Sequence, residues 1–400
     1  MKLTEKGKEA FELAYKHYRN EPFSAADLSA VSGIKIAAAS LTALEKKGLL
    51  EKFPTKPVTF KIIEGAEELV EQEEDSTKKG ADNTNLAKAK KEKNDEFYTR
   101  FEDIEAEVSK YKKYFKNKVV YLNCDDKEQS MFWKFFELNF DAFQLKKLIA
   151  TYYSETEPVY AYKLELSEDL NKDGFIDQKD IVKTPLIGNG DFRSQECIDI
   201  LKESDIVCTN PPFSLFREYV AQLMEYNKQF LIIGNQNAFT YKEIFPLIKD
   251  NKIWVGYTKP KNFYVPEDFE NKAIAYNEEG RKIAKFGNIC WFTNIPNKKR
   301  NEPIVLTATY AEGPNHREDY PKYDNYDAIE VSRCKNIPCD YDGVMGVPIT
   351  FLNDYCPEQF KIIDINPHFF SLVSQGLPKP KQLSIEGRKD PYARILIKRK

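Results

Sequence analysis

The stretch Asp205-Ile-Val-Cys-Thr-Asn-Pro-Pro-Phe213 (DIVCTNPPF) joins a run of apolar and β-branched residues to two consecutive prolines. The apolar run is typical of a buried parallel strand. Proline has no backbone N–H to donate to a sheet, so the strand is expected to stop at Asn210. Residues 215–226 follow with helical spacing. This order predicts that Asn210 lies at the carboxyl edge of a sheet, where open α/β folds bind their ligands.

The chain from Asn94 onward alternates apolar runs with helical patterns. Strands are predicted at residues 118–124, 147–153, 206–209 and 229–235, and an aromatic helix at residues 129–140. Strands that alternate with helices imply right-handed crossovers and a largely parallel sheet. The predicted fold class is therefore α/β.

Residues 1–63 have the pattern of a separate small module. Helices are predicted at residues 4–18, 25–31 and 36–47, and a two-stranded wing at residues 49–63. This order resembles the winged helix-turn-helix family, on the residues AADLSAVSGIKIAAASLTALEKKGLL. The exposed candidates on the third helix are Lys35, Ser40 and Thr42, whereas base reading usually uses Arg, Asn or Gln. DNA reading and protein docking both stay open for this module.

Composition separates this module from the rest of the chain. Residues 64–93 are acidic, then rich in Ser, Thr, Lys and Asn, then basic, and they hold few large apolar side chains. Such a segment cannot bury a core and is predicted to be a linker. The expected organisation is a module at 1–63, a linker at 64–93, a catalytic domain at 94–300 and a C-terminal region at 301–400.

Composition and charge narrow the functional classes. The apolar content of 42% is enough for real cores in a chain of 400 residues. A net charge of −3 gives no global field for nucleic acid, and the basic strips at 88–93, 298–300 and 379–400 suit either phosphate contacts or a solvated face. No apolar run is long enough to span a membrane, and seven scattered cysteines favour the reducing cytoplasm.

The residues Asn210 to Phe213 offer chemistry for a weakly nucleophilic exocyclic amine. The side-chain oxygen of Asn210 and the carbonyl of Pro211 can accept both amine hydrogens, which favours a more tetrahedral and reactive nitrogen. Pro211 and Pro212 hold these acceptors rigid and add no competing donor. Phe213 provides a ring on which a base rotated out of the duplex can stack. These four residues are the predicted catalytic loop.

Residues from about 94 to the C-terminus are similar to the adenine-specific DNA methyltransferases typified by the EcoRI modification methylase. The resemblance rests on NDEFYT (94–99), VVYLNCDD (119–126), GNGDF (188–192), TNPPFSLFREYV (209–220), IWVGY (253–257), FGNICWFTN (286–294) and YDGVMGVPITFL (341–352). It implies a Rossmann-like domain that uses S-adenosylmethionine, a C-terminal target-recognition region, and site-specific methylation of N6 on a flipped-out adenine in double-stranded DNA. A restriction-modification or mobile-element context follows, with a cognate restriction endonuclease as an expected partner.

The resemblance also implies a cofactor site. Carried over by motif, its residues are Phe97, Tyr98 and Thr99 at the methionine end, Asp191 and Phe192 at the adenine, and Asp125 and Asp126 after the first strand. One departure from the class makes the assignment of Asp125 and Asp126 to the cofactor site weaker. Asn123-Cys-Asp-Asp126 stands where the wider methyltransferase class has a glycine-rich turn. Glu155 is a candidate for the cofactor ribose.

Two other functions stay open on the sequence. The same loop serves methylation of other planar nitrogens, in RNA or in a protein glutamine. A non-catalytic DNA-binding regulator is the third possibility, against which the intact Asn210–Phe213 loop argues.

Residues 169–180 (DLNKDGFIDQKD) have the spacing of an EF-hand calcium loop, with Gly174 at the sharp turn. The predicted ligands are Asp169, Asn171, Asp173, the Phe175 carbonyl, Asp177 and Asp180. Calcium here would be structural, because methyl transfer needs no metal. The alternative is a polar turn between strands, because Asp, Asn and Gly favour turns.

Overall fold

The computed structural model divides the chain into two compact units, residues 1–86 and 87–400, which we describe separately. The described residues are 10–11, 13–14, 18, 21–32, 36, 38–45, 49–53, 55, 57–62, 98–123, 131–154, 161–265, 269, 274–277, 280–317, 319–378, 382–389 and 392–400. Most of the helix predicted at 4–18 and the whole linker predicted at 64–93 lie outside them. Within these ranges, no helix has the length and apolar character needed to cross a membrane.

The described part of the N-terminal unit contains two helices, α2 and α3, a three-stranded antiparallel sheet, and helical residues at 10–11, 13–14 and 18 within the helix predicted at 4–18. Its elements are β1 (Phe23–Ser24), α2 (Ala25–Ser32), α3 (Ala38–Glu45), β2 (Leu50–Phe53) and β3 (Thr59–Ile62). The two later helices and the β2–β3 hairpin occur where they were predicted, whereas β1 was not expected. Ser24 and Asp27 cap α2 reciprocally: the Asp27 carboxylate accepts from the Ser24 N–H at 2.8 Å, and the Ser24 hydroxyl accepts from the Asp27 N–H at 3.2 Å.

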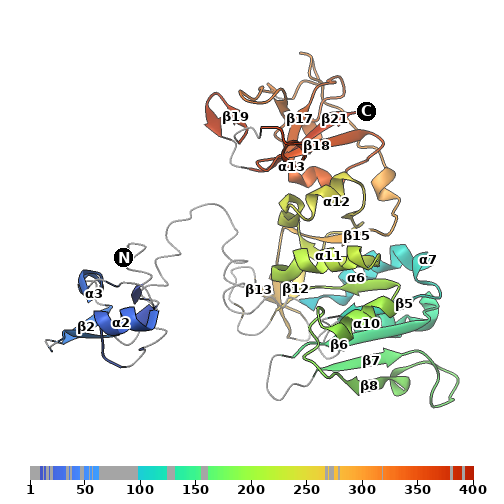
Figure 1. Cartoon of the computed structure of the whole chain (residues 1–400). Coiled ribbons are helices and arrows are strands. Elements are labelled where there is room, and N and C mark those ends of the chain that lie inside the picture. The colour runs from blue at the N-terminus through green and yellow to red at the C-terminus, as the bar shows by residue number, and fades with distance from the viewer. Residues whose placement is uncertain are drawn as a thin grey trace. The chain divides into compact units, whose positions relative to one another are not determined.

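Residues 87–400 are built around an eight-stranded mixed sheet (Figure 1). Its strands are β5 (Val119–Asn123), β6 (Lys147–Tyr152), β7 (Tyr162–Leu166), β8 (Val182–Pro185), β9 (Ile206–Thr209), β10 (Gln229–Asn235), β11 (Trp254–Val255) and β15 (Ile289–Thr293). They are ordered β11-β15-β10-β9-β5-β6-β7-β8. The four predicted strands β6, β5, β9 and β10 run parallel in the centre, which confirms them, and the outer strands pair antiparallel.

Helices cover both faces of this sheet (Figure 1). One face carries α10 (Gln195–Glu203) and α11 (Phe216–Glu225), and the other carries α6 (Phe101–Val108) and α8 (Met131–Leu138). Neighbouring residues of β15 point to opposite faces of the sheet and contact helices of different layers. Phe292 meets Phe216 of α11 with ring centroids 5.0 Å apart, and Trp291 meets Phe132 of α8 at 5.9 Å. The helices predicted at 129–140 and 215–226 thus form opposite layers of one α/β fold.

The described part of this unit contains three further sheets, two of four strands and one that pairs β19 (Ser384–Ile385) with β20 (Arg388–Lys389). The first contains β4 (Tyr98–Thr99), β12 (Asn262–Tyr264), β13 (Ile274–Tyr276) and β14 (Lys282–Lys285); the second contains β16 (Ile329–Glu330), β17 (Met345–Pro348), β18 (Phe360–Asn366) and β21 (Arg394–Arg399). Val347 and Ile395 of the second sheet belong to the same buried cluster as Phe239 and Phe292. The C-terminal sheet therefore shares a continuous hydrophobic core with the α/β sheet.

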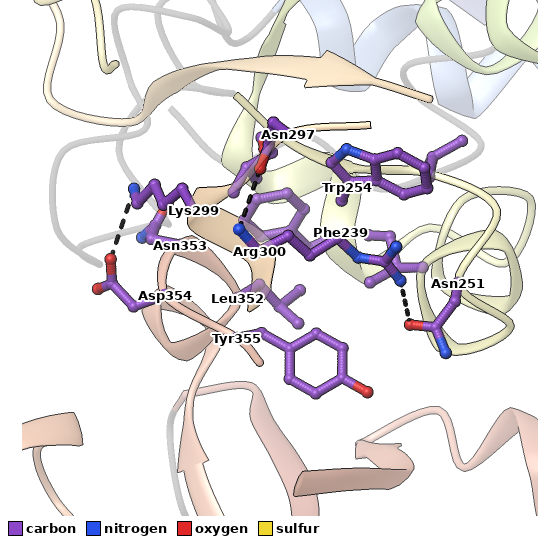
Figure 2. A pocket seen from close by; sticks show the side chains of 13 residues that line it. Phe239, Asn251, Trp254, Asn297, Lys299, Arg300, Leu352, Asn353, Asp354 and Tyr355 are labelled. Atoms are coloured by element: carbon purple, nitrogen blue, oxygen red, sulfur yellow. Dashed lines mark hydrogen bonds and ion pairs between the residues drawn. The ribbon is translucent and has the colours of Figure 1, made fainter. Parts of the chain in front are cut away.

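A pocket lies where the C-terminal residues meet the outer strand β11 (Figure 2). The Arg300 guanidinium stacks over the Trp254 ring at 4.1 Å and donates to Asn251 Oδ1 at 2.6 Å. Lys299 pairs with Asp354 at 3.5 Å. Residues 210–213 are not among the described residues that line this pocket, so it belongs to the junction of the two sheets and not to the predicted catalytic loop.

Candidate active site

The predicted catalytic loop leaves the sheet at the carboxyl end of β9. All four residues of β9 are buried, and the strand ends at Thr209, as the proline pair predicted. Asn210 and Pro212 are half-buried and Pro211 is buried. Phe213 opens a 3-10 turn and is only 8% exposed. The open stacking ring expected from the sequence is therefore mostly covered in this structure, because an uncovered ring would leave apolar surface in water.

Asn123, at the end of β5, holds both ends of this loop. Its backbone oxygen accepts from the Thr209 hydroxyl at 2.8 Å, and its side-chain oxygen accepts from the Tyr219 hydroxyl of α11. All three residues are buried. Because the loop connects β9 to α11, these two hydrogen bonds fix its entry and its exit to the same residue.

Phe192, predicted to contact the cofactor adenine, packs against the same helix. Its ring lies 5.1 Å from that of Tyr219, centroid to centroid, in an edge-on arrangement. Its backbone oxygen accepts from Gln222 Nε2 at 3.1 Å. The structure thus brings the 188–192 segment next to the helix that follows the catalytic loop.

The Asp191 carboxylate is oriented by Arg193. The Arg193 side chain donates to both carboxylate oxygens, at 2.7 and 3.0 Å, and its backbone N–H donates to Oδ1 at 2.8 Å. These bonds hold the pKa of Asp191 below its ordinary value, so the group is ionised at neutral pH. An ionised acceptor of fixed orientation suits the amine or hydroxyl groups of a ligand.

Gly190 allows this segment to approach the end of β6. Its φ is +80°, and a Cβ added there would lie 2.3 Å from the Tyr152 carbonyl oxygen. The Asn189 carbonyl also accepts from the Ser154 N–H at 2.9 Å. The backbone before Asp191 therefore forms a close cradle at the carboxyl edge that only glycine fits.

Tyr98 and Thr99 form β4, in a different sheet from the catalytic loop. They pair with Tyr264 and Phe263 of β12. The Thr99 hydroxyl is buried and has no hydrogen-bond partner among the described residues. Such a group costs about 1–3 kcal/mol unless water or a ligand satisfies it. The remaining predicted cofactor residues, Phe97, Asp125 and Asp126, and the ribose candidate Glu155 lie outside the described residues.

Residues 85–400 match the family described as adenine-specific methyltransferase EcoRI. The chain belongs to this family. Type II methyltransferase M.EcoRI of Escherichia coli is 47% identical over 338 residues, which cover 80% of this chain and 98% of that protein. Type II methyltransferase M.MgeORF184P of Mycoplasma genitalium is 40% identical, with 78% and 98% covered, and M.MpnI of Mycoplasma pneumoniae is 46% identical, with 70% and 86% covered. The resemblance inferred from the motifs is confirmed.

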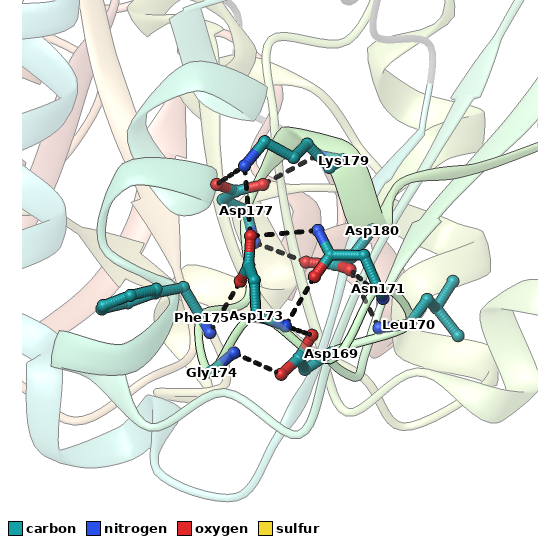
Figure 3. Close-up of polar contacts among 9 residues, drawn as sticks. All are labelled: Asp169, Leu170, Asn171, Asp173, Gly174, Phe175, Asp177, Lys179 and Asp180. Atoms are coloured by element: carbon teal, nitrogen blue, oxygen red, sulfur yellow. Dashed lines mark hydrogen bonds and ion pairs between the residues drawn. The ribbon is translucent and has the colours of Figure 1, made fainter.

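The loop of this methyltransferase at residues 169–180 joins the antiparallel strands β7 and β8 (Figure 3). Its carboxylates bind the loop's own backbone. Asp180 accepts from the Leu170 N–H at 2.9 Å, and Asp169 accepts from the Gly174 N–H at 2.8 Å. Lys179 Nζ lies 3.1 Å from Asp173 Oδ2. This arrangement is the polar turn given as the alternative.

The predicted calcium ligands make hydrogen bonds within the loop. No group of three or more acidic, histidine or cysteine side chains among the described residues is placed to hold a metal ion. The predicted ligands Asp169, Asn171, Asp173, Phe175, Asp177 and Asp180 follow EF-hand spacing, but two antiparallel strands flank them where an EF-hand has helices. Their oxygens accept from backbone donors within the loop, and calcium binding by these residues stays a prediction.

The sequence missed three residues that shape the site, namely Asn123, Gly190 and Tyr219. Asn123 carried a signal, because it is a polar residue at the end of a buried strand. Gly190 stood in a motif without a stated role. Tyr219 also stood in a quoted motif (209–220) without a stated role, because its contact depends on how α11 lies over the end of β5.

Gly190→Ala is expected to destabilise the protein by about 1–3 kcal/mol, because the methyl group would meet the Tyr152 carbonyl and the backbone would be strained at positive φ. Gly188→Ala is the matched control: a Cβ there meets nothing within 4 Å, so a change within about 0.5 kcal/mol is expected. Urea unfolding of both variants measures the difference. Equal stabilities would show that the close approach at Gly190 does not constrain the segment.

Calcium binding at residues 169–180 stays a prediction that titration can decide. If calcium binds, calorimetry should detect it at millimolar concentration, and the melting temperature should rise. Asp169→Ala with Asp173→Ala should remove both effects. If titration of the unchanged protein with calcium shows no heat of binding, the loop is a polar turn without a metal.

Proposed function

We propose that this methyltransferase transfers the methyl group of S-adenosylmethionine to N6 of an adenine rotated out of double-stranded DNA, within a restriction-modification system. The observation that supports this most is the loop Asn210–Phe213, held at both ends by Asn123 at the carboxyl edge of the sheet. A loop fixed in this way presents two acceptors in a constant geometry, which is what an amine substrate requires.

The residues around the loop fit S-adenosylmethionine. Thr99 has an unsatisfied buried hydroxyl for the methionine end, next to Tyr98. Asp191 offers an oriented carboxylate for the adenine end, and Phe192 positions that segment against Tyr219. S-adenosylmethionine supplies an electrophilic methyl group on a sulfonium. Phe97, Asp125 and Asp126 are proposed cofactor residues on their motifs alone.

The chain's own contribution to the reaction is to orient the amine and stabilise its charge. The Asn210 side-chain oxygen and the Pro211 carbonyl would accept the two N6 hydrogens, so that the nitrogen lone pair points away from the base plane. The same two acceptors favour the positive charge that develops on N6 in the transition state. Pro212 would add rigidity, and Phe213 is the proposed stacking ring for the base.

The remaining parts are assigned to recognition. We assign residues 301–400 to target reading, because their sheet shares a core with the α/β sheet. The N-terminal unit, with its two helices and hairpin, has the element order of a winged-helix module, which would contact DNA or a protein partner. A cognate restriction endonuclease is the proposed partner, and the cytoplasm, where the DNA lies, is the proposed location.

Asn210→Ala should lower kcat by about 100-fold or more, because one preorganised acceptor is lost, and should leave the dissociation constant for S-adenosylmethionine nearly unchanged. Ser214→Ala, an exposed neighbour in the following turn, is the control and should keep full turnover. Tritiated S-adenosylmethionine with DNA, RNA and protein in separate reactions measures transfer and identifies the substrate class. Near-normal turnover of Asn210→Ala, or label in RNA or protein alone, would contradict the proposal.

A chain that begins at Lys88 should fold and methylate DNA, because residues 1–86 form their own compact unit. If the N-terminal unit binds DNA, its removal should raise KM and flatten the dependence of KM on salt, with kcat nearly intact. If it docks a protein, KM should not change. A folded but inactive truncated chain would show that the N-terminal unit is part of the catalytic body.

A further inference from the structure

Asn235 is a buried amide with one half of its hydrogen-bonding capacity unused. It is the last residue of β10 and is 6% exposed. Its Nδ2 is inaccessible to solvent and has no hydrogen-bond partner among the described residues. A buried amide donor without a hydrogen-bond partner is unfavourable, and such a group in a native structure calls for an explanation such as a ligand.

The orientation of this amide is set by its oxygen. Oδ1 accepts from the Asn237 N–H at 2.8 Å and from Asn288 Nδ2 at 3.2 Å. Turning the amide over would place its NH2 group against two donors. The oxygen must therefore stay where it is, and Nδ2 is held as a donor that faces away from both partners.

Asn235 also lies beside the catalytic loop. β10 runs parallel to β9, with Ile232 opposite Thr209. β9 ends at Thr209, and Asn235 lies three residues beyond Ile232 on β10, past the last residue pair of the two strands. Asn235 and the catalytic loop therefore both lie at the carboxyl edge of two adjacent parallel strands, where open α/β sheets bind their ligands.

We propose that Asn235 is a specificity-determining residue whose Nδ2 donates a hydrogen bond to a ring nitrogen of the flipped adenine, either N1 or N7. This inference rests on the proposed function. Both nitrogens flank the 6-amino group and are acceptors in adenine. N1 of guanine carries a hydrogen, so a bond to N1 excludes guanine by itself, whereas N7 is an acceptor in both purines and a bond to N7 discriminates only together with the contacts to the amine. With Asn210 and Pro211 accepting from the amine, a donor from Asn235 completes the pattern that adenine alone among the purines satisfies.

The test combines protein variants with base analogues. Once the methylated site has been mapped on plasmid DNA, three synthetic duplexes carry adenine, 1-deazaadenine or 7-deazaadenine at the target. The unchanged full chain is expected to lose at least about tenfold in kcat/KM on one analogue, as one hydrogen bond is removed. Asn235→Asp, assayed at pH 8 to keep the carboxylate ionised, should lower kcat/KM on the adenine duplex by a similar factor. Replacing adenine by that analogue should then cause no further decrease in kcat/KM of this variant.

Gln236→Glu is the matched control, because it makes the same change at the next residue, which is 7% exposed and already has Asn353 Oδ1 as a partner at 3.2 Å. The kcat/KM of Gln236→Glu should fall on the analogue by the same factor as that of the unchanged chain. Asn235→Ser serves if the aspartate variant does not fold. If, for both analogues, the decrease in kcat/KM caused by Asn235→Asp multiplies with the decrease caused by the analogue, the residue and the ring nitrogen act independently. The proposal for Asn235 is then overturned, while the methyltransferase assignment stands. If the unchanged chain labels no adenine in DNA, both are overturned.

Discussion

The two hydrogen bonds that Asn123 accepts are the constraint on which the geometry of the catalytic loop depends. The loop contains two prolines and cannot be held by a sheet ladder, because proline has no N–H to donate. Its shape is instead set by its ends, where Thr209 and Tyr219 donate to the backbone and side-chain oxygens of Asn123. Losing one of these buried donors would leave the Asn123 oxygen unsatisfied, at a cost of about 1–3 kcal/mol. The neighbouring strand β5 and the helix α11 therefore restrain the loop through these contacts.

This dependence gives a physical meaning to the departure from the glycine-rich turn of the wider methyltransferase class. A glycine at the end of β5 would bring backbone close to a ligand but would offer no side chain to Tyr219. Asn123 offers one, and Tyr219 in turn supports Phe192. One residue thus connects the segment proposed for the cofactor with the loop proposed for the base. Asn123 thus provides a side-chain connection at the end of β5, and Gly190, which follows β8 in the chain, provides a close backbone approach to the end of β6.

Local patterns were enough to predict the frame of the fold but not the contacts that position the site. The strands at 206–209 and 229–235 follow from apolar runs, and the end of β9 follows from the chemistry of proline, so both could be read from the sequence. The contact between Tyr219 and Asn123 joins residues 96 positions apart, and no local pattern encodes it. The loop at 169–180 shows a further limit of local patterns: its spacing matches a calcium site, but spacing within the loop carries no information about the antiparallel strands that flank it. The burial of Phe213 likewise depends on what packs around it.

The C-terminal sheet is joined to this edge by direct contacts as well as by a shared core. Gln236, which follows the last residue of β10, donates to Asn353 in the 3-10 turn Ile349–Asn353 at 3.2 Å, and both side chains are buried. A displacement of the C-terminal region would therefore break a buried hydrogen bond beside the carboxyl edge, not only rearrange surface side chains. If residues 301–400 read the duplex, the contacts made at a correct site are coupled through Asn353 to Gln236, the residue that follows Asn235. Recognition and base positioning are then parts of a single packed body, which is how a site-specific methyltransferase can make the placement of the amine depend on the sequence around it.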